Sequence, residues 1–146
     1  MKLMDVRELY DADFFEWTQR NAALLRAGRL DQIDIQHVAE ELEDMGKRDK
    51  RQLENRLEVL LVHLLKWKVQ RRESRSWRST IGTQRRRMQK LLSEMPSLGP
   101  RIADQLPEVY SDAVRSTIEQ TGLPNSCFPE RCPFTVEEIL DQDFLP

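Results

Sequence analysis

The sequence predicts an all-α fold, a compact bundle of about five to seven helices. Apolar residues recur every three or four positions through several long stretches, which is the spacing of one helical face. No stretch alternates apolar and polar residues for long enough to form a strand. Charged residues make up 33% of the chain and only 5 residues are Gly, and with the periodic stretches this composition favours a globular chain over a disordered one.

The chain has 146 residues, which is the size of one domain, so we expect a single helical domain over residues 1–146. The longest apolar run, residues 59–65, is interrupted by His63 and is far short of the roughly 20 residues that span a bilayer. The first thirty residues lack an apolar stretch followed by a small-residue cleavage site. We therefore expect no membrane segment and a cytoplasmic location.

The first expected helix covers about residues 13–27, with Gly28 at the left-handed position that follows many helices. Asn21 lies on its apolar face and must find a hydrogen-bond partner if it is buried. The apolar residues of this face are Tyr10, Phe14, Trp17, Leu24 and Leu25.

A second helix is expected to begin after Asp31 or Asp34, since either carboxylate can cap its first turn. Its apolar face consists of Ile35, Val38, Leu42 and Met45. Gly46 and the polar residues KRDKRQ then interrupt this pattern. The sequence is compatible with a bend near Gly46 or with one long helix.

Residues 53–70 are expected to form the central helix. Their apolar residues continue at helical spacing, and residues 59–65 are apolar on nearly every side. A helix that is apolar all round belongs in the middle of a domain.

The next helix is expected to start at Ser74 or Ser76 and to stop before Pro96. A short helical turn over residues 101–105 should precede a helix over about residues 108–120, with Pro107 in its first turn. A last short helix is expected where Thr135 and Glu138 form a capping-box pattern.

Charge is unevenly distributed, although the net charge is only −2. Residues 1–45 carry 5 basic and 11 acidic groups, residues 66–90 carry 10 basic and one acidic group, and residues 91–146 carry 3 and 10. The chain therefore has a basic block between two acidic ends.

The basic block raises the hypothesis of nucleic-acid binding. Its candidate contacts fall in one sector of a helical projection if the helix is continuous through residues 73–76. They are Arg71, Arg75, Arg78, Arg85 and Arg86. Arginine suits bidentate phosphate contacts. The alternative is that these side chains form ordinary surface ion pairs with the acidic ends, and the pI of 5.8 lies well below 9.

The acidic residues Glu40, Glu41, Glu43 and Asp44 form either a site or a solvated helix face. A metal-dependent hydrolase would have to use His37, Glu41 and His63 as ligands. The sequence has no Glu-x-x-His element of the kind that di-iron bundles use. A hydrogen-bonded His37 and a core His63 are the simpler interpretations, and we expect no metal and no cofactor.

Cys127 and Cys132 lie in a proline-rich segment near the end of the chain. A zinc site would need two further ligands, and both histidines are far upstream. Reduced, partly buried thiols are therefore expected.

Several motifs occur in an order that resembles the bacterial family called domain of unknown function 29, over nearly the whole chain. The most specific are EELEDMG at residues 40–46, HLLKW at 63–67, RSWR at 75–78 and the ending DFLP at 143–146. The resemblance implies an α-helical fold and brings no activity or cofactor with it. Cys132 lies in the family-like CPFT segment, whereas Cys127 lies in none of the motifs.

The sequence thus predicts the fold better than the activity. The preferred hypothesis is a non-enzymatic interaction or regulatory module that binds a protein partner or associates with itself. Nucleic-acid binding through residues 71–90 and metal-dependent hydrolysis are the alternatives.

Overall fold

All regular structure that the computed structural model describes, in residues 4–146, is helical. These residues form six α-helices and two short 3₁₀ helices, which confirms the all-α class and the expected number of helices. The chain divides into two compact units, residues 1–48 and 49–146. Each unit is described by itself below, and the expectation of one domain over the whole chain stays a prediction.

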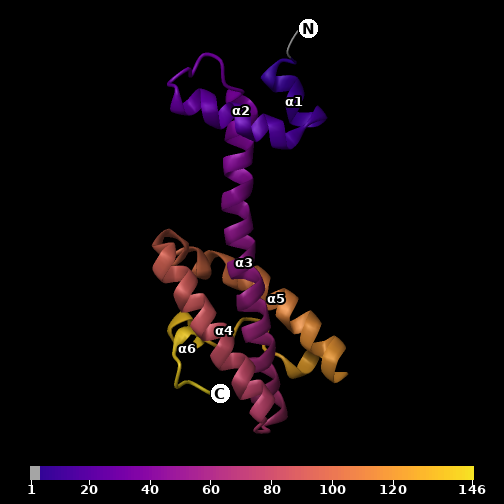
Figure 1. Ribbon diagram of the computed structural model, residues 1–146. Coiled ribbons are helices and arrows are strands. Elements are labelled where there is room, and N and C mark those ends of the chain that lie inside the picture. Colours follow the sequence, from indigo (N-terminus) through magenta and orange to yellow (C-terminus); the bar gives the residue numbers. More distant parts are fainter. Residues whose placement is uncertain (1–3) are drawn as a thin grey trace. The chain divides into compact units, whose positions relative to one another are not determined.

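The first unit contains α1 (Val6–Ala12), α2 (Phe14–Arg26) and the start of α3 (Ile35–Gln70) (Figure 1). Its core is small and consists of Val6, Leu9 and Trp17, with Tyr10 and Val38 packed against them. The first unit therefore buries few apolar side chains, although it contains parts of three helices.

The sequence interpretation missed α1, because a helix of 7 residues presents too few apolar positions to establish a period. Its start is marked by a capping box: the Asp5 N–H donates to the Glu8 carboxylate at 3.3 Å, and the Asp5 carboxylate accepts from the Arg7 N–H at 2.8 Å. Asp13 ends α1 and caps α2 by accepting the Glu16 N–H at 3.1 Å. The start of α2 and the left-handed Gly28 (φ 73°) match the prediction.

One continuous helix, α3, runs through the region where a bend was considered. The long-helix alternative is therefore confirmed, because the helix is not interrupted at Gly46. Residues 42–48 are all exposed, including Leu42 and Met45 of the predicted apolar face. Asp34 rather than Asp31 caps the helix, since its side chain accepts the His37 N–H at 3.4 Å.

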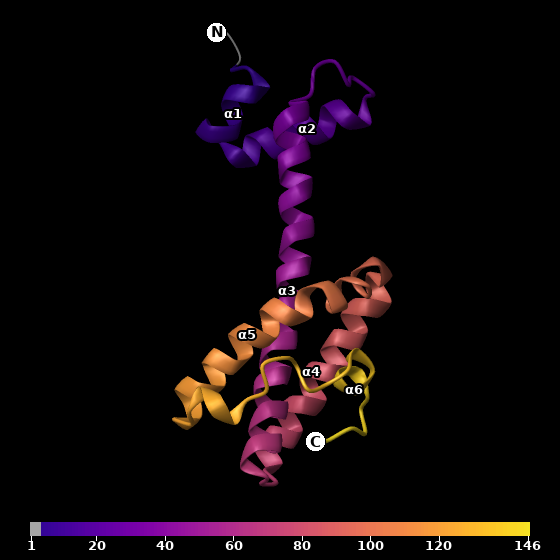
Figure 2. The same cartoon turned by 180° about the vertical axis from the view of Figure 1, so that it is seen from behind.

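The second unit is built around the C-terminal part of α3. In both views α4 (Arg75–Glu94) and α5 (Arg101–Thr121) lie beside this part, and α6 (Val136–Leu140) lies beside α4 (Figures 1 and 2). These helices and the C-terminal segment share one hydrophobic core. Six leucines of α3 are fully buried in it, which confirms the central helix: Leu53, Leu57, Leu60, Leu61, Leu64 and Leu65.

The helices of the second unit begin at the caps that the sequence predicted, with one exception. Ser74 caps α4, and Thr135 caps α6 in the expected capping box. The expected break before Pro107 is wrong, because α5 continues through this residue. Val109 and Ala113 keep the apolar face of the helix in the core, and this packing outweighs the backbone hydrogen bond that proline cannot make.

The remaining short elements are 3₁₀ helices at Pro96–Leu98 and Asn125–Cys127. Both cysteines are free thiols: Cys127 is exposed, and Cys132 is half-buried with its pKa raised by burial. Across residues 4–146, no helix combines the length and the apolar character needed to cross a bilayer.

Candidate functional site

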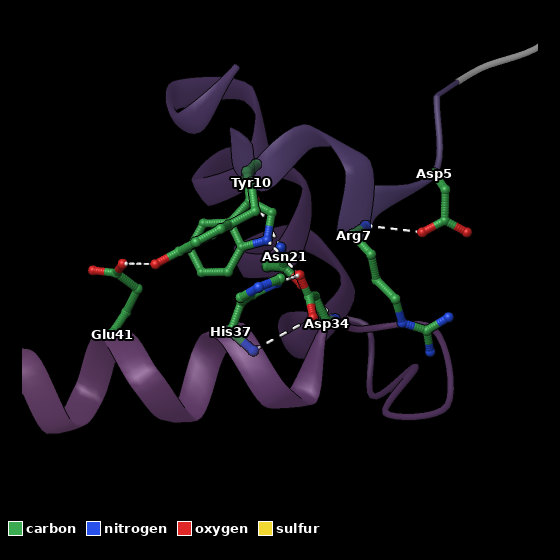
Figure 3. A network of polar contacts seen from close by, with 8 residues as sticks. Asp5, Arg7, Tyr10, Asn21, Asp34, His37 and Glu41 are labelled. Atoms are coloured by element: carbon green, nitrogen blue, oxygen red, sulfur yellow. Dashed lines mark hydrogen bonds and ion pairs between the residues drawn. The ribbon is translucent and has the colours of Figure 1, made fainter. Parts of the chain in front are cut away.

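A buried carboxylate at the start of α3 organises the first unit. Asp34 is 2% exposed, and its Oδ2 atom accepts the Trp17 indole N–H at 3.0 Å and lies 2.6 Å from Nδ1 of His37 (Figure 3). Burial alone would raise the pKa of Asp34, but the hydrogen bonds from Trp17 and His37 outweigh it and lower the pKa below its usual value. Asp34 is therefore a buried carboxylate that stays ionised.

Asn21 joins this network from α2. Its side-chain N–H donates to the Trp17 carbonyl at 2.9 Å, and its Oδ1 atom accepts the Asp34 N–H at 2.9 Å. The prediction that a buried Asn21 needs partners is confirmed. Its two hydrogen bonds attach the segment before α3 to the middle of α2.

Tyr10 connects α1 to the predicted candidates His37 and Glu41. The Tyr10 and His37 rings are stacked, with centroids 3.9 Å apart and planes 6° apart, and the Tyr10 hydroxyl donates to the Glu41 carboxylate at 2.6 Å (Figure 3). The hydrogen bond to Glu41 is the largest of the effects that raise the pKa of Tyr10 to about 12. His37 and Glu41 thus do lie near each other, and both help to hold α1 against α3.

The third proposed metal ligand, His63, belongs to the second unit, where its Nδ1 atom lies 2.8 Å from the Val59 carbonyl. Burial lowers the pKa of His63. No group of three or more His, Cys, Asp or Glu side chains within residues 4–146 is arranged to hold a metal ion. The hydrolase hypothesis therefore gains no support from ligand geometry.

The first unit leaves most of its large apolar side chains in solvent. Nine such side chains are exposed in residues 4–146, and eight of them lie in this unit: Met4, Phe14, Phe15, Leu25, Leu30, Ile35, Leu42 and Met45. Ile35 and Leu42 are each 62% exposed, and Phe15 is 72% exposed. An accumulation of this kind marks a contact surface more often than scattered single residues do.

Three of these residues, Ile35, Leu42 and Met45, are called the exposed stripe below. Val38 completes their helical spacing and packs against the core of the unit, so the stripe continues from that core along α3. The sequence predicted the stripe correctly as one helix face. The sequence did not reveal that, of the four residues of this face, Val38 alone packs against the core of the unit.

Carboxylates surround the exposed stripe. Glu40, Glu43 and Asp44 are exposed on the same turns of α3, whereas Glu41 is half-buried beneath Tyr10. Residues 4–48 contain 11 acidic and 6 basic groups. The predicted acidic candidates Glu40, Glu43 and Asp44 therefore border an apolar surface.

The basic candidates of the second unit separate into two kinds. Arg71, Arg75, Arg78 and Arg86 are exposed. Arg85 is 1% exposed and donates to three main-chain carbonyls, those of Ile139 at 2.8 Å, Phe144 at 2.7 Å and Glu138 at 3.1 Å.

Arg85 therefore holds the C-terminal segment against α4 and is not available to a nucleic acid. Its position could have been recognised in the sequence, because Ile81, Arg85 and Met88 are spaced by four and three residues. This spacing places Arg85 on the apolar face of its helix.

The exposed arginines are not neutralised by nearby carboxylates. Within residues 4–146 the ion pairs closer than 4 Å are His37–Asp34 and Arg115–Asp112, and neither involves the basic block. Two of its arginines lie over indole rings instead: Arg72 is 5.3 Å from the Trp77 centroid, and Arg78 is 5.8 Å from the Trp67 centroid. Within residues 49–146, the expected pairing of the basic block with the acidic C-terminal end is not found at this distance.

Comparison with known proteins places the chain in a family. No curated protein and no solved structure matches it. The family described as Domain of unknown function DUF29 matches residues 9–145 of the 146, and this match includes all the motifs quoted above except the last residue of the DFLP ending. The chain belongs to this family.

Proposed function

We propose that this chain is a protein-interaction module whose first unit binds a positively charged, amphipathic segment of a partner protein. The observation that carries the proposal is that eight of the nine exposed large apolar side chains of residues 4–146 lie in the first unit. A partner that covers them removes apolar surface from water, which contributes about 25 cal/mol for each Å² buried.

The charge of the first unit favours a basic partner. Glu40, Glu43 and Asp44 lie beside the exposed stripe, and acidic groups outnumber basic ones in residues 4–48. Anionic lipid and nucleic acid would be repelled by this surface, and so would the same surface of a second copy. A helix with one apolar face and flanking Lys or Arg residues would satisfy both the stripe and its carboxylates.

The buried network supports this role by fixing the surface in place. Asp34 bonds to Trp17 and His37, and Tyr10 bonds to Glu41, so α1 and α2 are attached to the first turns of α3. A surface held in one conformation loses less conformational freedom when a partner binds.

The test is comparative co-purification from the native cell with the full chain as bait. Leu42→Gln combined with Met45→Gln removes two residues of the exposed stripe while keeping good helix formers in α3. Val59→Gln is the matched control, since Val59 is an exposed aliphatic residue on the same helix but in the second unit. We expect a protein recovered by the wild type and the control to be reduced about tenfold or more with the double variant, because each buried aliphatic side chain contributes about 1.5–3 kcal/mol.

Two results would overturn the proposal. One is that the double variant recovers the same proteins in the same amounts as the wild type. The other is that light scattering shows a dimeric wild type and a monomeric double variant, since the occupant would then be a second copy of this chain.

Nucleic-acid binding by the second unit is a second candidate function. The observation in its favour is that Arg71, Arg75, Arg78 and Arg86 are exposed and form no ion pair with a carboxylate of residues 49–146. Anisotropy of a labelled oligonucleotide tests it. Binding should weaken steeply with added salt and should be lost in Arg75→Gln/Arg78→Gln/Arg86→Gln. Salt-independent binding, or unchanged binding by the triple variant, would exclude this candidate.

A cytoplasmic location and a bacterial source remain part of the proposal. Both are what the family resemblance implies.

A further inference from the structure

A pocket in the second unit lies at the turn between α3 and α4. It has a volume of about 740 Å³, and its wall includes the basic residues Lys68, Arg71 and Arg72. Glu73 is the single Asp or Glu side chain of this wall. The volume falls in the range of small-molecule sites, about 300–1,000 Å³.

The three cations of this pocket outnumber its one acidic side chain, Glu73. Lys68, Arg71 and Arg72 are exposed, and no carboxylate of residues 49–146 lies within 4 Å of them in an ion pair. Three positive charges along five residues repel one another when the pocket is empty. An anion between them would relieve that repulsion.

The backbone of Arg71 supplies an independent observation. Its φ is 48°, and within residues 4–146 it is the one residue other than glycine with positive φ. The chain uses glycine for the same left-handed conformation after α2 and after α5, at Gly28 (φ 73°) and Gly122 (φ 72°).

Glycine adopts this conformation without the steric penalty that a Cβ atom brings. Arg71 therefore has a long cationic side chain at a position where glycine would adopt the backbone conformation at lower cost. Side chains retained in such conformations concentrate at functional sites.

The rest of the wall limits the class of ligand. Trp67, Val69 and Pro129 are apolar. Guanidinium groups bind phosphate oxygens through paired hydrogen bonds. The pocket therefore has cationic groups for a phosphate and apolar wall for an organic remainder.

We infer that the pocket at the α3–α4 turn binds a phosphate-bearing ligand through Lys68, Arg71 and Arg72. The phosphate belongs either to a free organic phosphate or to the end of a nucleic-acid strand. This site is separate from the protein-binding surface of the first unit, and it does not depend on the function proposed for that surface.

The decisive variant is Arg71→Gly in the full chain. It removes the cation and also relieves the backbone strain, so folding and binding should change in opposite directions. We expect its unfolding temperature to equal or exceed that of the wild type, because glycine accepts the left-handed conformation. Binding of ATP and of pyrophosphate, measured by calorimetry at low salt, should fall about tenfold or more.

Two further variants distinguish binding in the pocket from general electrostatic attraction to a basic surface. Arg71→Lys keeps the charge and should retain part of the affinity, since an ammonium group still attracts phosphate without the paired hydrogen bonds. Arg101→Gln removes an exposed arginine on α5 that does not line the pocket. It should bind like the wild type.

Cys127 gives a second readout, because it is exposed and lies in the pocket wall. Bound ligand should slow its alkylation by a maleimide. The half-buried Cys132 lies outside this wall and serves as the internal reference.

A 12-nucleotide single-stranded oligonucleotide with a 5′-phosphate identifies the source of the phosphate. Binding of ATP and pyrophosphate with protection of Cys127 indicates a free phosphate compound, whereas binding and protection by the oligonucleotide alone indicate a strand end. The inference is overturned if none of the three probes protects Cys127, or if Arg71→Gly binds as tightly as the wild type.

Discussion

At the scale of single residues, Asp34 has the largest role in the first unit. It caps α3, accepts the Trp17 indole N–H and contacts His37, and it does so from a nearly solvent-free position. The sequence indicated the cap but could not reveal Trp17 as a partner. That hydrogen bond joins residues 17 positions apart and depends on tertiary packing.

Replacement of Asp34 by Asn should destabilise the first unit in a pH-dependent way. The lowered pKa of Asp34 means that the ionised form is favoured by folding. The ionised Asp34 carboxylate therefore contributes its full stabilisation of the folded state above the unfolded-state pKa of about 3.9. This stabilisation is lost as the pH falls through the lower pKa of the folded state. At pH 7 we expect Asp34→Asn to cost about 1–3 kcal/mol.

Tryptophan fluorescence and circular dichroism during thermal unfolding measure this difference between pH 7 and pH 3. Asp11→Asn serves as the control, because Asp11 is exposed. A gap between wild type and Asp34→Asn that is as large at pH 3 as at pH 7 would show that the charge of Asp34 is not what stabilises the unit.

Arg85 is the residue of greatest structural importance in the second unit. Arg85→Met should cost about 3 kcal/mol or more, because three main-chain carbonyls lose their donor at once. Arg86→Gln, one position along α4 and exposed, should change stability by less than about 0.5 kcal/mol.

Limited proteolysis adds a local readout for Arg85. Cleavage within residues 140–146 should become faster in Arg85→Met than in Arg86→Gln. Equal cleavage rates and equal unfolding temperatures in the two variants would contradict the anchoring role of Arg85.

At the scale of elements, the sequence predicted helices best where apolar spacing and a cap occur together. The helices that start at the Ser74 cap and at the Thr135 capping box satisfy this condition, and both are found; residues 53–70 were found from their sustained apolar spacing alone. Helix α1 was missed because it is short, and α5 was divided wrongly because a local rule about Pro107 was given more weight than the apolar face that continues past it. The uncovered face of α3 could not be predicted, since periodicity identifies an apolar face without showing what covers it.

The continuity of α3 leads to a prediction about Gly46. This glycine lies inside the helix, its φ is not positive, and an added Cβ would meet no atom within 4 Å. Gly46→Ala should therefore stabilise the chain by about 0.5–1 kcal/mol, as alanine does inside other helices.

Gly28→Ala provides the matched comparison. Space is also free around Gly28, but its φ of 73° strains any residue with a Cβ atom, so this variant should unfold at a lower temperature. If Gly46→Ala is destabilised instead, the helix is not continuous at Gly46 in solution.

At the scale of the whole molecule, the sequence showed clearly that charge is unevenly distributed. It did not show whether the basic block is paired or available to a ligand. Acidic groups dominate residues 4–48, and the basic block belongs to the second unit. Within residues 49–146, the exposed arginines of the basic block form no ion pair with a carboxylate. Their charge therefore remains available to a ligand of opposite sign.

This separation predicts how the full chain responds to charged partners. An 18-residue amphipathic helix of Leu and Lys should bind the wild type, and its Leu/Glu counterpart should not.

Glu40→Gln/Glu43→Gln/Asp44→Asn should weaken binding of the Leu/Lys peptide several-fold and reduce its sensitivity to salt, because exposed charges attract through a screened interaction. Leu42→Gln/Met45→Gln should weaken the same complex without changing its salt sensitivity, since it removes apolar contact only. Fluorescence anisotropy at two salt concentrations separates these effects. Equal binding of both peptides would mean that charge does not select the partner, whereas loss of Leu/Lys binding in Arg75→Gln/Arg78→Gln alone would place the contact in the second unit.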